Sequence, residues 1–117
     1  MWDIEYFEKA NGRYPAKEYI DNLPPQDQIR VIRNLSLLSE FGKDARRPLV
    51  APLHNHIYEL RTKLLNRNSR ILFFFFKEDR IILTHGIIKK SGKVSDSDIE
   101  KAVACRMDYL ERHGEKP

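Results

Sequence analysis

The sequence predicts an α+β fold: a small antiparallel sheet, formed by an N-terminal strand and a three-strand meander, with two N-terminal helices and one C-terminal helix. Three patterns indicate this fold. Strand-like segments separated by tight turns fill residues 57–88, amphipathic helical patterns flank them, and the run Ile71–Phe76 is apolar at all six positions. A strand that is apolar on both faces must be covered on both sides, so this run is expected at the centre of the sheet.

Length and composition predict a single domain over residues 1–117. Hydrophobic residues make up 41% of the 117 positions, which is enough for a core, and no repeat or low-complexity linker interrupts them. The only cysteine, Cys105, leaves no partner for an internal disulfide. It falls within an amphipathic helical pattern, where we interpret it as a small buried apolar residue.

The chain lacks the patterns of a membrane or secreted protein. Its longest apolar run has six residues, whereas a membrane-spanning helix needs about 20. The first residues are acidic and lack the long apolar stretch of a signal peptide. We therefore expect a soluble, cytoplasmic protein without a membrane partner.

The first 52 residues predict one strand and two helices. Trp2–Phe7 begins by alternating apolar and polar side chains, which is typical of a strand. Pro15 suits the first position of a short helix that runs to about Asn22. A second helix is expected over Pro25–Phe41, followed by a loop over Gly42–Pro52. The apolar face of this second helix is predicted to contain Ile29, Ile32, Leu35, Leu38 and Phe41.

The remaining residues predict three strands and a helix. The strands are expected over Ile57–Leu65, Arg70–Lys77 and Arg80–Ile88, and their short connections imply an antiparallel meander. Ser95 is expected to cap a final helix that ends near His113. Its apolar stripe is predicted to contain Ile99, Val103, Met107 and Leu110. The expected core of the whole domain comprises Ile32, Leu35, Leu38, Leu60, Phe73, Phe75, Ile82, Val103 and Leu110.

Positive charge is concentrated in residues 57–93. This segment holds nine lysines and arginines against three acids, whereas the rest of the chain holds 12 against 14. The net charge of +4 therefore arises entirely from the strand-rich segment. A small sheet that carries such an excess is suited to a polyanion, and RNA is the first candidate.

Several classes of chemistry lack their sequence motifs. The four histidines and the single cysteine have no zinc-site spacing, so we expect no metal site. Phosphate-binding loops of the GxxxxGK[ST] and GxGxxG types are absent, as is a serine nucleophile elbow. We therefore expect no cofactor.

Alternation along the strands gathers cations on one face. Glu59, Arg61 and Lys63 project together, and Arg70 at the start of the next strand joins them if the register allows. A shift of one residue would move Arg70 and His85 to the other face. Fixed cations on one face can hold a phosphate and stabilise the charge of a phosphorane-like transition state.

Each of these residues also has a structural interpretation. Arg61 alternatively pairs with Glu59, Arg70 is a solvated strand end, and His85 is a hydrogen-bonded core histidine. The pair Lys89-Lys90 is alternatively a basic loop without a ligand. His54 and His56 titrate near neutral pH and suit acid–base work, but a position in an exposed loop explains them equally well.

A set of short motifs resembles a known family. The motifs are Glu59-Leu60-Arg61, Arg70-Ile71-Leu72, His85-Gly86, Lys89-Lys90, Lys93 and Asp108-Tyr109-Leu110. Over roughly residues 57–112 the chain resembles the RelE/HigB superfamily of type II toxin–antitoxin systems, in particular its phage Gp49-like branch. Four positions depart from the usual pattern of that branch: Phe73 replaces a tyrosine, Ile87 replaces a phenylalanine, and Val94-Ser95 replaces a Thr-Pro pair.

The resemblance implies a RelE-like toxin that cleaves mRNA in the ribosomal A site. In that chemistry a ribose 2′-hydroxyl attacks the adjacent phosphate without a metal, leaving a 2′,3′-cyclic phosphate and a 5′-hydroxyl. The implied catalytic residues are Arg61, Arg70, Lys90 and His85, and the implied RNA-binding residues are Lys63, Arg67, Lys89, Lys93 and His54. The base is left open between His85 and His54.

Two other functions remain open. Related ParE-like toxins inhibit DNA gyrase by protein binding and cleave no RNA, and a plain RNA-binding module would use exposed aromatic residues to stack bases. Under both toxin hypotheses the expected partner is a cognate antitoxin, for which we expect a helix-turn-helix domain. The nuclease would also have the ribosome and mRNA as partners. A short neighbouring reading frame for such an antitoxin would favour the toxin hypotheses.

Overall fold

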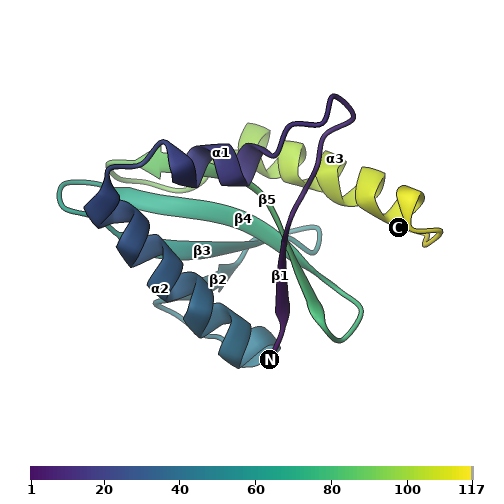
Figure 1. The fold of residues 1–117 in the computed structure, drawn as a ribbon, viewed down its shortest axis with the longest axis horizontal. Coiled ribbons are helices and arrows are strands. Elements are labelled where there is room, and N and C mark those ends of the chain that lie inside the picture. Colours follow the sequence, from purple (N-terminus) through teal and green to yellow (C-terminus); the bar gives the residue numbers. More distant parts are fainter. Residues whose placement is uncertain (117) are drawn as a thin grey trace.

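The computed structural model describes residues 1–116, which form a five-stranded mixed sheet between two helical layers (Figure 1). The strands are β1 (Asp3–Tyr6), β2 (Val50–Pro52), β3 (Tyr58–Lys63), β4 (Asn68–Phe76) and β5 (Arg80–Lys89). The helices are α1 (Pro15–Asp21), α2 (Pro25–Phe41) and α3 (Asp96–Arg112), with a short 3-10 turn, η1 (Gly42–Asp44). The α+β class and the three helices are confirmed.

The sheet has the order β1-β5-β4-β3-β2. β2, β3, β4 and β5 pair in antiparallel fashion, as the meander predicts. β1 instead pairs in parallel with β5, so the prediction of a purely antiparallel sheet is wrong. Tight turns force β3 to β5 to alternate in direction, whereas β1 is joined to β5 through most of the chain and no turn sets its direction.

The segment Gly42–Pro52 is not only the loop that its prolines and charges predict. It contains η1 and the edge strand β2, whose residue Val50 pairs with Leu60. A three-residue strand is too short to produce a visible alternation in sequence. Gly42 ends α2 with a φ of 52°, and the ring of Trp2 fills the space that a Cβ at this position would need.

β4 lies at the centre of the sheet, as the run Ile71–Phe76 predicts. Ile71 and Phe73 join the core beneath α1 and α2, while Leu72, Phe74 and Phe76 join the core beneath α3. Because both faces of this strand are covered, its apolar residues are removed from water on both sides. A bulge at Thr84 in β5 interrupts the register opposite Leu72 and Phe73.

The buried face of α2 differs from the predicted one. Val31, Leu35 and Leu38 are buried, whereas Ile32 is 52% exposed and Ile29 is 59% exposed. A spacing of three advances 300° around a helix, so a series at that spacing drifts around the axis instead of following one face. The spacings of four and three from Val31 to Leu38 do follow one face.

The other predicted core residues are mostly in place. Six of the nine are buried: Leu35, Leu38, Leu60, Phe73, Ile82 and Leu110. Phe75 and Val103 are only partly buried, and each packs against one of the two cores. In α3, Tyr109 is buried and Met107 is 44% exposed, so Met107 does not belong to the buried stripe.

Candidate functional site

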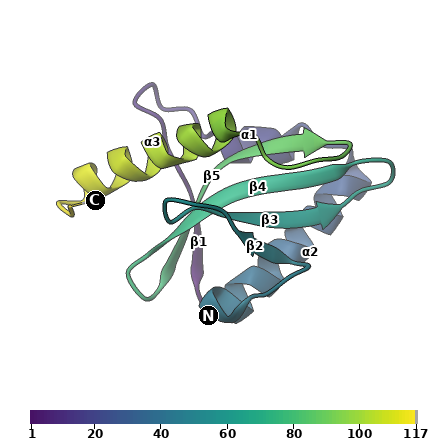
Figure 2. The same cartoon turned by 180° about the vertical axis from the view of Figure 1, so that it is seen from behind.

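One end of the sheet is left uncovered on the face that carries α3. The core beneath α3 includes Leu72, Phe74 and Phe76 of β4, so the helix covers the second half of that strand. Seen from this side, the opposite ends of β3, β4 and β5 have no helix over them (Figure 2). Leu60 and Ile71 point into the core beneath α2, so their strand neighbours point to the uncovered face.

The strand register brings four cations together on this face. Arg61 pairs across the strands with Arg70, and Lys63 and Lys89 both pair with Asn68. We call the set Arg61, Lys63, Arg70 and Lys89 the basic sheet face. The sequence prediction that Arg70 shares a face with Arg61 is therefore confirmed, because strand partners on adjacent strands point the same way.

A single carboxylate holds the two arginines. Glu59 Oε1 lies 3.2 Å from Arg61 Nε, and its Oε2 lies 3.6 Å from Arg70 Nε. The Glu59 side chain is 7% exposed and the Arg70 side chain 11%, while Arg61 keeps 33% of its surface in solvent. The pairing of Arg61 with Glu59 is thus present, but the two arginines carry one more positive charge than this acid neutralises.

An open groove of about 470 Å³ lies at the free edge of β3, beyond the end of β2. Its sheet side is formed by Arg61, Lys63, Asn68 and Arg70, and its rim by Asn34, Pro48, Leu49 and Thr62. A volume of this size is typical of a small-molecule or nucleotide site. The groove therefore presents the two arginines of the basic sheet face to a ligand.

His85 lies on the same face, near the start of α3. It pairs with Leu72, while Arg70 pairs with Ile87, so His85 is a diagonal neighbour of Arg70 at roughly 7–8 Å between Cα atoms. Thr84 donates its hydroxyl to Leu72 O, so the His85 Nδ1–H donates to Thr84 Oγ1 at 3.1 Å.

This tautomer leaves a lone pair on His85 Nε2. Among residues 1–116, that buried nitrogen has no hydrogen-bond partner, and the Asp98 carboxylate lies 3.6 Å away. Burial lowers the pKa of His85, and the charge of Asp98 opposes this shift only in part. A neutral imidazole can accept a proton, but this nitrogen is buried, and His85 lines a hollow with Lys101 and Cys105 that is separate from the groove.

Of the predicted site residues, only Arg61, Lys63 and Arg70 line the groove, and His85 and Lys89 do not. Lys90 and Lys93 are exposed in the segment after β5, next in sequence to the basic sheet face. His54 is exposed between β2 and β3, with Nε2 3.7 Å from Asp96 Oδ1 at the start of α3. Arg67 Nη2 instead lies 3.3 Å from Asp27 Oδ2 at the first turn of α2, so its guanidinium faces the helical layer away from the groove.

Two residues of this region were not predicted as site residues, although the spacing of Asp98 from Ser95 marks it as part of a helix cap. Asn68 lines the groove between Lys63 and Lys89, and Asp98 faces His85 as well as being bonded to Ser95. Extending β4 by two residues toward its start would have revealed Asn68. The role of Asp98 beside His85 depends on how α3 docks, which has no local sequence signal.

Gly86 in the His85-Gly86 motif has a packing role. It points toward α1, where a Cβ at this position would overlap the ring of Tyr19. The Tyr19 hydroxyl meets Ser69 Oγ at 2.7 Å and donates to Ile87 O at 3.2 Å, which ties α1 to β4 and β5. Glycine at this position therefore lets α1 pack closely on the strands that carry the site.

The fold and the site define a class: a small α+β domain with a cationic sheet face, a half-buried histidine and, among residues 1–116, no cluster of three or more potential metal-ligating side chains. The profile of the family described as phage-derived protein Gp49-like (DUF891) matches residues 18–106. The chain belongs to this family, which is related to the RelE/HigB-type toxins.

A search of curated proteins gave no match. Within residues 1–116, none of the helices combines the length and the apolar character that crossing a bilayer requires.

Proposed function

We propose that this protein is the toxin of a type II toxin–antitoxin system and that it cleaves mRNA on the ribosome. The convergence of Arg61 and Arg70 on one open groove carries this proposal. Two guanidinium groups on adjacent strands are suited to bind a phosphate through paired hydrogen bonds. The likeness to RelE/HigB-type toxins supports the choice of RNA as the source of that phosphate.

The proposed reaction is an intramolecular transesterification that expels the 3′ fragment. The ribose 2′-oxygen loses its proton and attacks the adjacent phosphorus, and the bond to the 5′-oxygen breaks. The 5′ fragment keeps a 2′,3′-cyclic phosphate, and the expelled 5′-oxygen takes up a proton from the base or from water to give a 5′-hydroxyl. The 2′-hydroxyl proton passes to a histidine, and the two candidates are His85 and His54. The neutral form of His85 is favoured, but its Nε2 is buried beside Asp98, whereas His54 is exposed. Arg61 and Arg70 stabilise the charge that grows on the phosphate oxygens.

The remaining cations assist the substrate. Lys63 and Lys89 extend the basic sheet face along the RNA backbone, and Lys90 lies next to Lys89 at the end of the strand. The flexible ammonium groups of lysine act as point charges toward phosphate, whereas the arginines set its orientation. The ribosome supplies the rest of the positioning, and an antitoxin neutralises the cations when the toxin is inactive.

The test uses Arg61→Ala, with Lys17→Ala as a control. Lys17 is exposed on α1 and pairs with Asp21. We expect Arg61→Ala to abolish growth arrest and Lys17→Ala to retain it, with unchanged circular dichroism in both. Full toxicity of a folded Arg61→Ala protein would remove Arg61 from the site.

Mapping RNA ends after brief induction tests the reaction itself. New cuts within translated codons, ending in 2′,3′-cyclic phosphate, are expected for the wild type and not for Arg61→Ala. DNA damage without such cuts would instead indicate a ParE-like gyrase poison. A neighbouring reading frame for a helix-turn-helix protein that restores growth when coexpressed would identify the antitoxin.

A further inference from the structure

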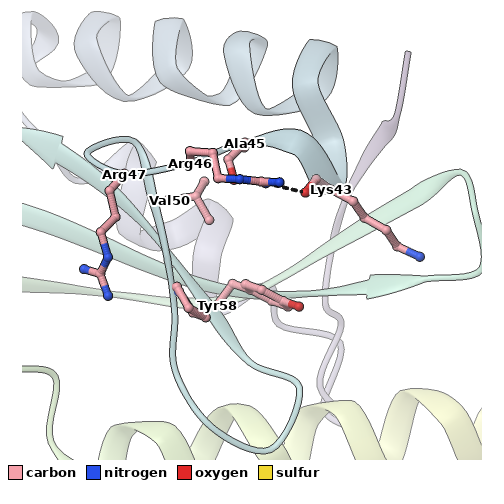
Figure 3. A pocket seen from close by; sticks show the side chains of 7 residues that line it. Lys43, Ala45, Arg46, Arg47, Val50 and Tyr58 are labelled. Atoms are coloured by element: carbon pink, nitrogen blue, oxygen red, sulfur yellow. Dashed lines mark hydrogen bonds between the residues drawn. The ribbon is translucent and has the colours of Figure 1, made fainter.

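A second cationic pocket lies at the β2 edge of the sheet, on the other side of residues 45–50 from the groove. It has a volume of about 490 Å³ and is lined by Lys43, Ala45, Arg46, Arg47, Val50, Pro52 and Tyr58 (Figure 3). We propose that this pocket is a second RNA subsite, in which the RNA backbone runs along the three cations, spread from Arg47 past Arg46 to Lys43, and a base stacks against Tyr58. This inference rests on the proposed function, because it takes RNA as the ligand of the groove.

The three cations differ in how they are held. Arg46 Nη1 donates to Lys43 O at 3.0 Å and to Ala45 O at 3.2 Å, which fixes the guanidinium and leaves Nε and Nη2 for an anion. Within the described residues, Arg47 is in no ion pair. Lys43 pairs with Glu78 at 3.3 Å, but the Glu78 side chain is 86% exposed, so a phosphate readily replaces this contact.

No acidic side chain lines this pocket among the described residues. The basic sheet face differs in this respect, because Glu59 neutralises part of its charge. A polyanion that lies along the pocket therefore passes three cations and displaces only the exposed Lys43–Glu78 ion pair.

Tyr58 supplies a rigid ring. It stacks on Phe73 with ring centroids 5.7 Å apart and an interplanar angle of 22°, and Phe75 meets it edge-on at 5.1 Å. The ring also lines the pocket, across from Arg46 in Figure 3. A ring that is already fixed loses little freedom when a base stacks on it, which is how proteins hold single-stranded RNA. An acidic peptide would use the cations but would leave the aromatic surface without a role.

The two sites are neighbours along one segment. Arg47 and Val50 line the second pocket, whereas Pro48 and Leu49, which lie between them in sequence, line the groove with Arg61 and Arg70. A ligand that occupies both must be a chain with repeated negative charges. A single strand of RNA has this property, and a mononucleotide has not.

The direct test measures binding of a fluorescent single-stranded 2′-O-methyl oligoribonucleotide, which cannot undergo 2′-hydroxyl attack. Fluorescence anisotropy is recorded over a range of salt concentrations without ribosomes. Lys43→Ala/Arg47→Ala leaves Arg46 and its backbone hydrogen bonds in place. We expect this variant to bind at least about tenfold more weakly. The slope of log K against log salt should become shallower by about 0.7 for each phosphate that the variant no longer neutralises.

Tyr58 variants separate stacking from charge. Tyr58→Phe keeps the ring and is expected to bind as the wild type does. Tyr58→Leu removes the ring and is expected to bind about fivefold or more weakly, which corresponds to the stacking of one base. Lys17→Ala/Lys116→Ala removes two exposed charges outside both sites and is expected to bind within about twofold of the wild type.

The outcomes separate this inference from the proposed nuclease activity. The subsite is wrong if Lys43→Ala/Arg47→Ala binds within about twofold of the wild type with the same salt slope, or if the control variant weakens binding equally. Message cleavage by the wild type together with normal binding by the pocket variants would overturn the subsite alone. Weakened binding in the pocket variants without any message cleavage would support the subsite and overturn the nuclease.

Discussion

The buried carboxylate of Glu59 offers the sharpest test of how the site is built. Glu59→Gln keeps the length and shape of the side chain but removes the charge that Arg61 and Arg70 share. Both guanidiniums then face each other across adjacent strands without a counter-ion. We expect a lower free energy of unfolding, because a buried charge without its partner keeps its desolvation cost.

The magnitude follows from the burial of the three groups. Removing one partner from a buried ion pair costs about 3–5 kcal/mol. Arg61 is one-third exposed and glutamine still accepts a hydrogen bond, so we expect the lower end, about 3 kcal/mol. For a domain of this size each kcal/mol lowers the Tm by roughly 4 °C, which gives a decrease of about 12 °C.

A double-mutant cycle provides the measurement. Urea and thermal unfolding are compared for the wild type, Glu59→Gln, Arg70→Met and the double variant, with Glu100→Gln on the exposed side of α3 as the control. The loss of unfolding free energy in the double variant should be smaller than the sum of the losses in the two single variants, by at least about 1.5 kcal/mol. A coupling energy below about 0.5 kcal/mol would refute the conclusion that Glu59 and Arg70 form a stabilising ion pair.

Three further predictions concern the surroundings of the site. Gly86→Ala should lower stability by about 1–3 kcal/mol, because its Cβ overlaps the Tyr19 ring; unfolding by urea measures this, and an unchanged midpoint would contradict it. Burial lowers the pKa of His85 from its ordinary 6.5, so the unfolded chain takes the proton first and stability falls as the pH drops below about 6.5. His85→Gln should lose less stability than the wild type between about pH 7 and pH 5.5, and parallel losses would contradict the burial of a neutral ring. Burial raises the pKa of Cys105 to about 11 from 9.0, so iodoacetamide at about pH 8 should alkylate it about 100-fold more slowly in the folded protein than in urea. Equal rates would show that the thiol is accessible and unperturbed.

Elements of the fold are predicted correctly where the sequence pattern that specifies them is local. The run Ile71–Phe76 identifies the central strand, and the predicted limits of α2, Pro25 and Phe41, match the structure because proline and glycine mark its two ends. The predicted orientation of α2 is wrong, because it places Ile29 and Ile32 on the buried face although both are exposed. Apolar side chains also occur on surfaces, so their identity alone does not locate the buried face.

The candidate site was predictable only in part. Alternation in a strand places Arg61 and Lys63 on one face, and the short turn to the next strand brings Arg70 beside them. The same excess of positive charge includes Arg67, which turns to Asp27 on the opposite side. The pocket at Lys43 depends on how a loop passes the sheet edge, and no periodic pattern specifies that path.

The parallel pairing of β1 with β5 has a consequence for synthesis of the chain. Asp3 leaves the ribosome early, but its partner Arg80 is made 77 residues later. The first strand therefore waits, without its neighbour, until the 77 residues that separate the two have been translated. A contact between positions so distant in sequence closes slowly, so completion of the sheet is a late event in folding.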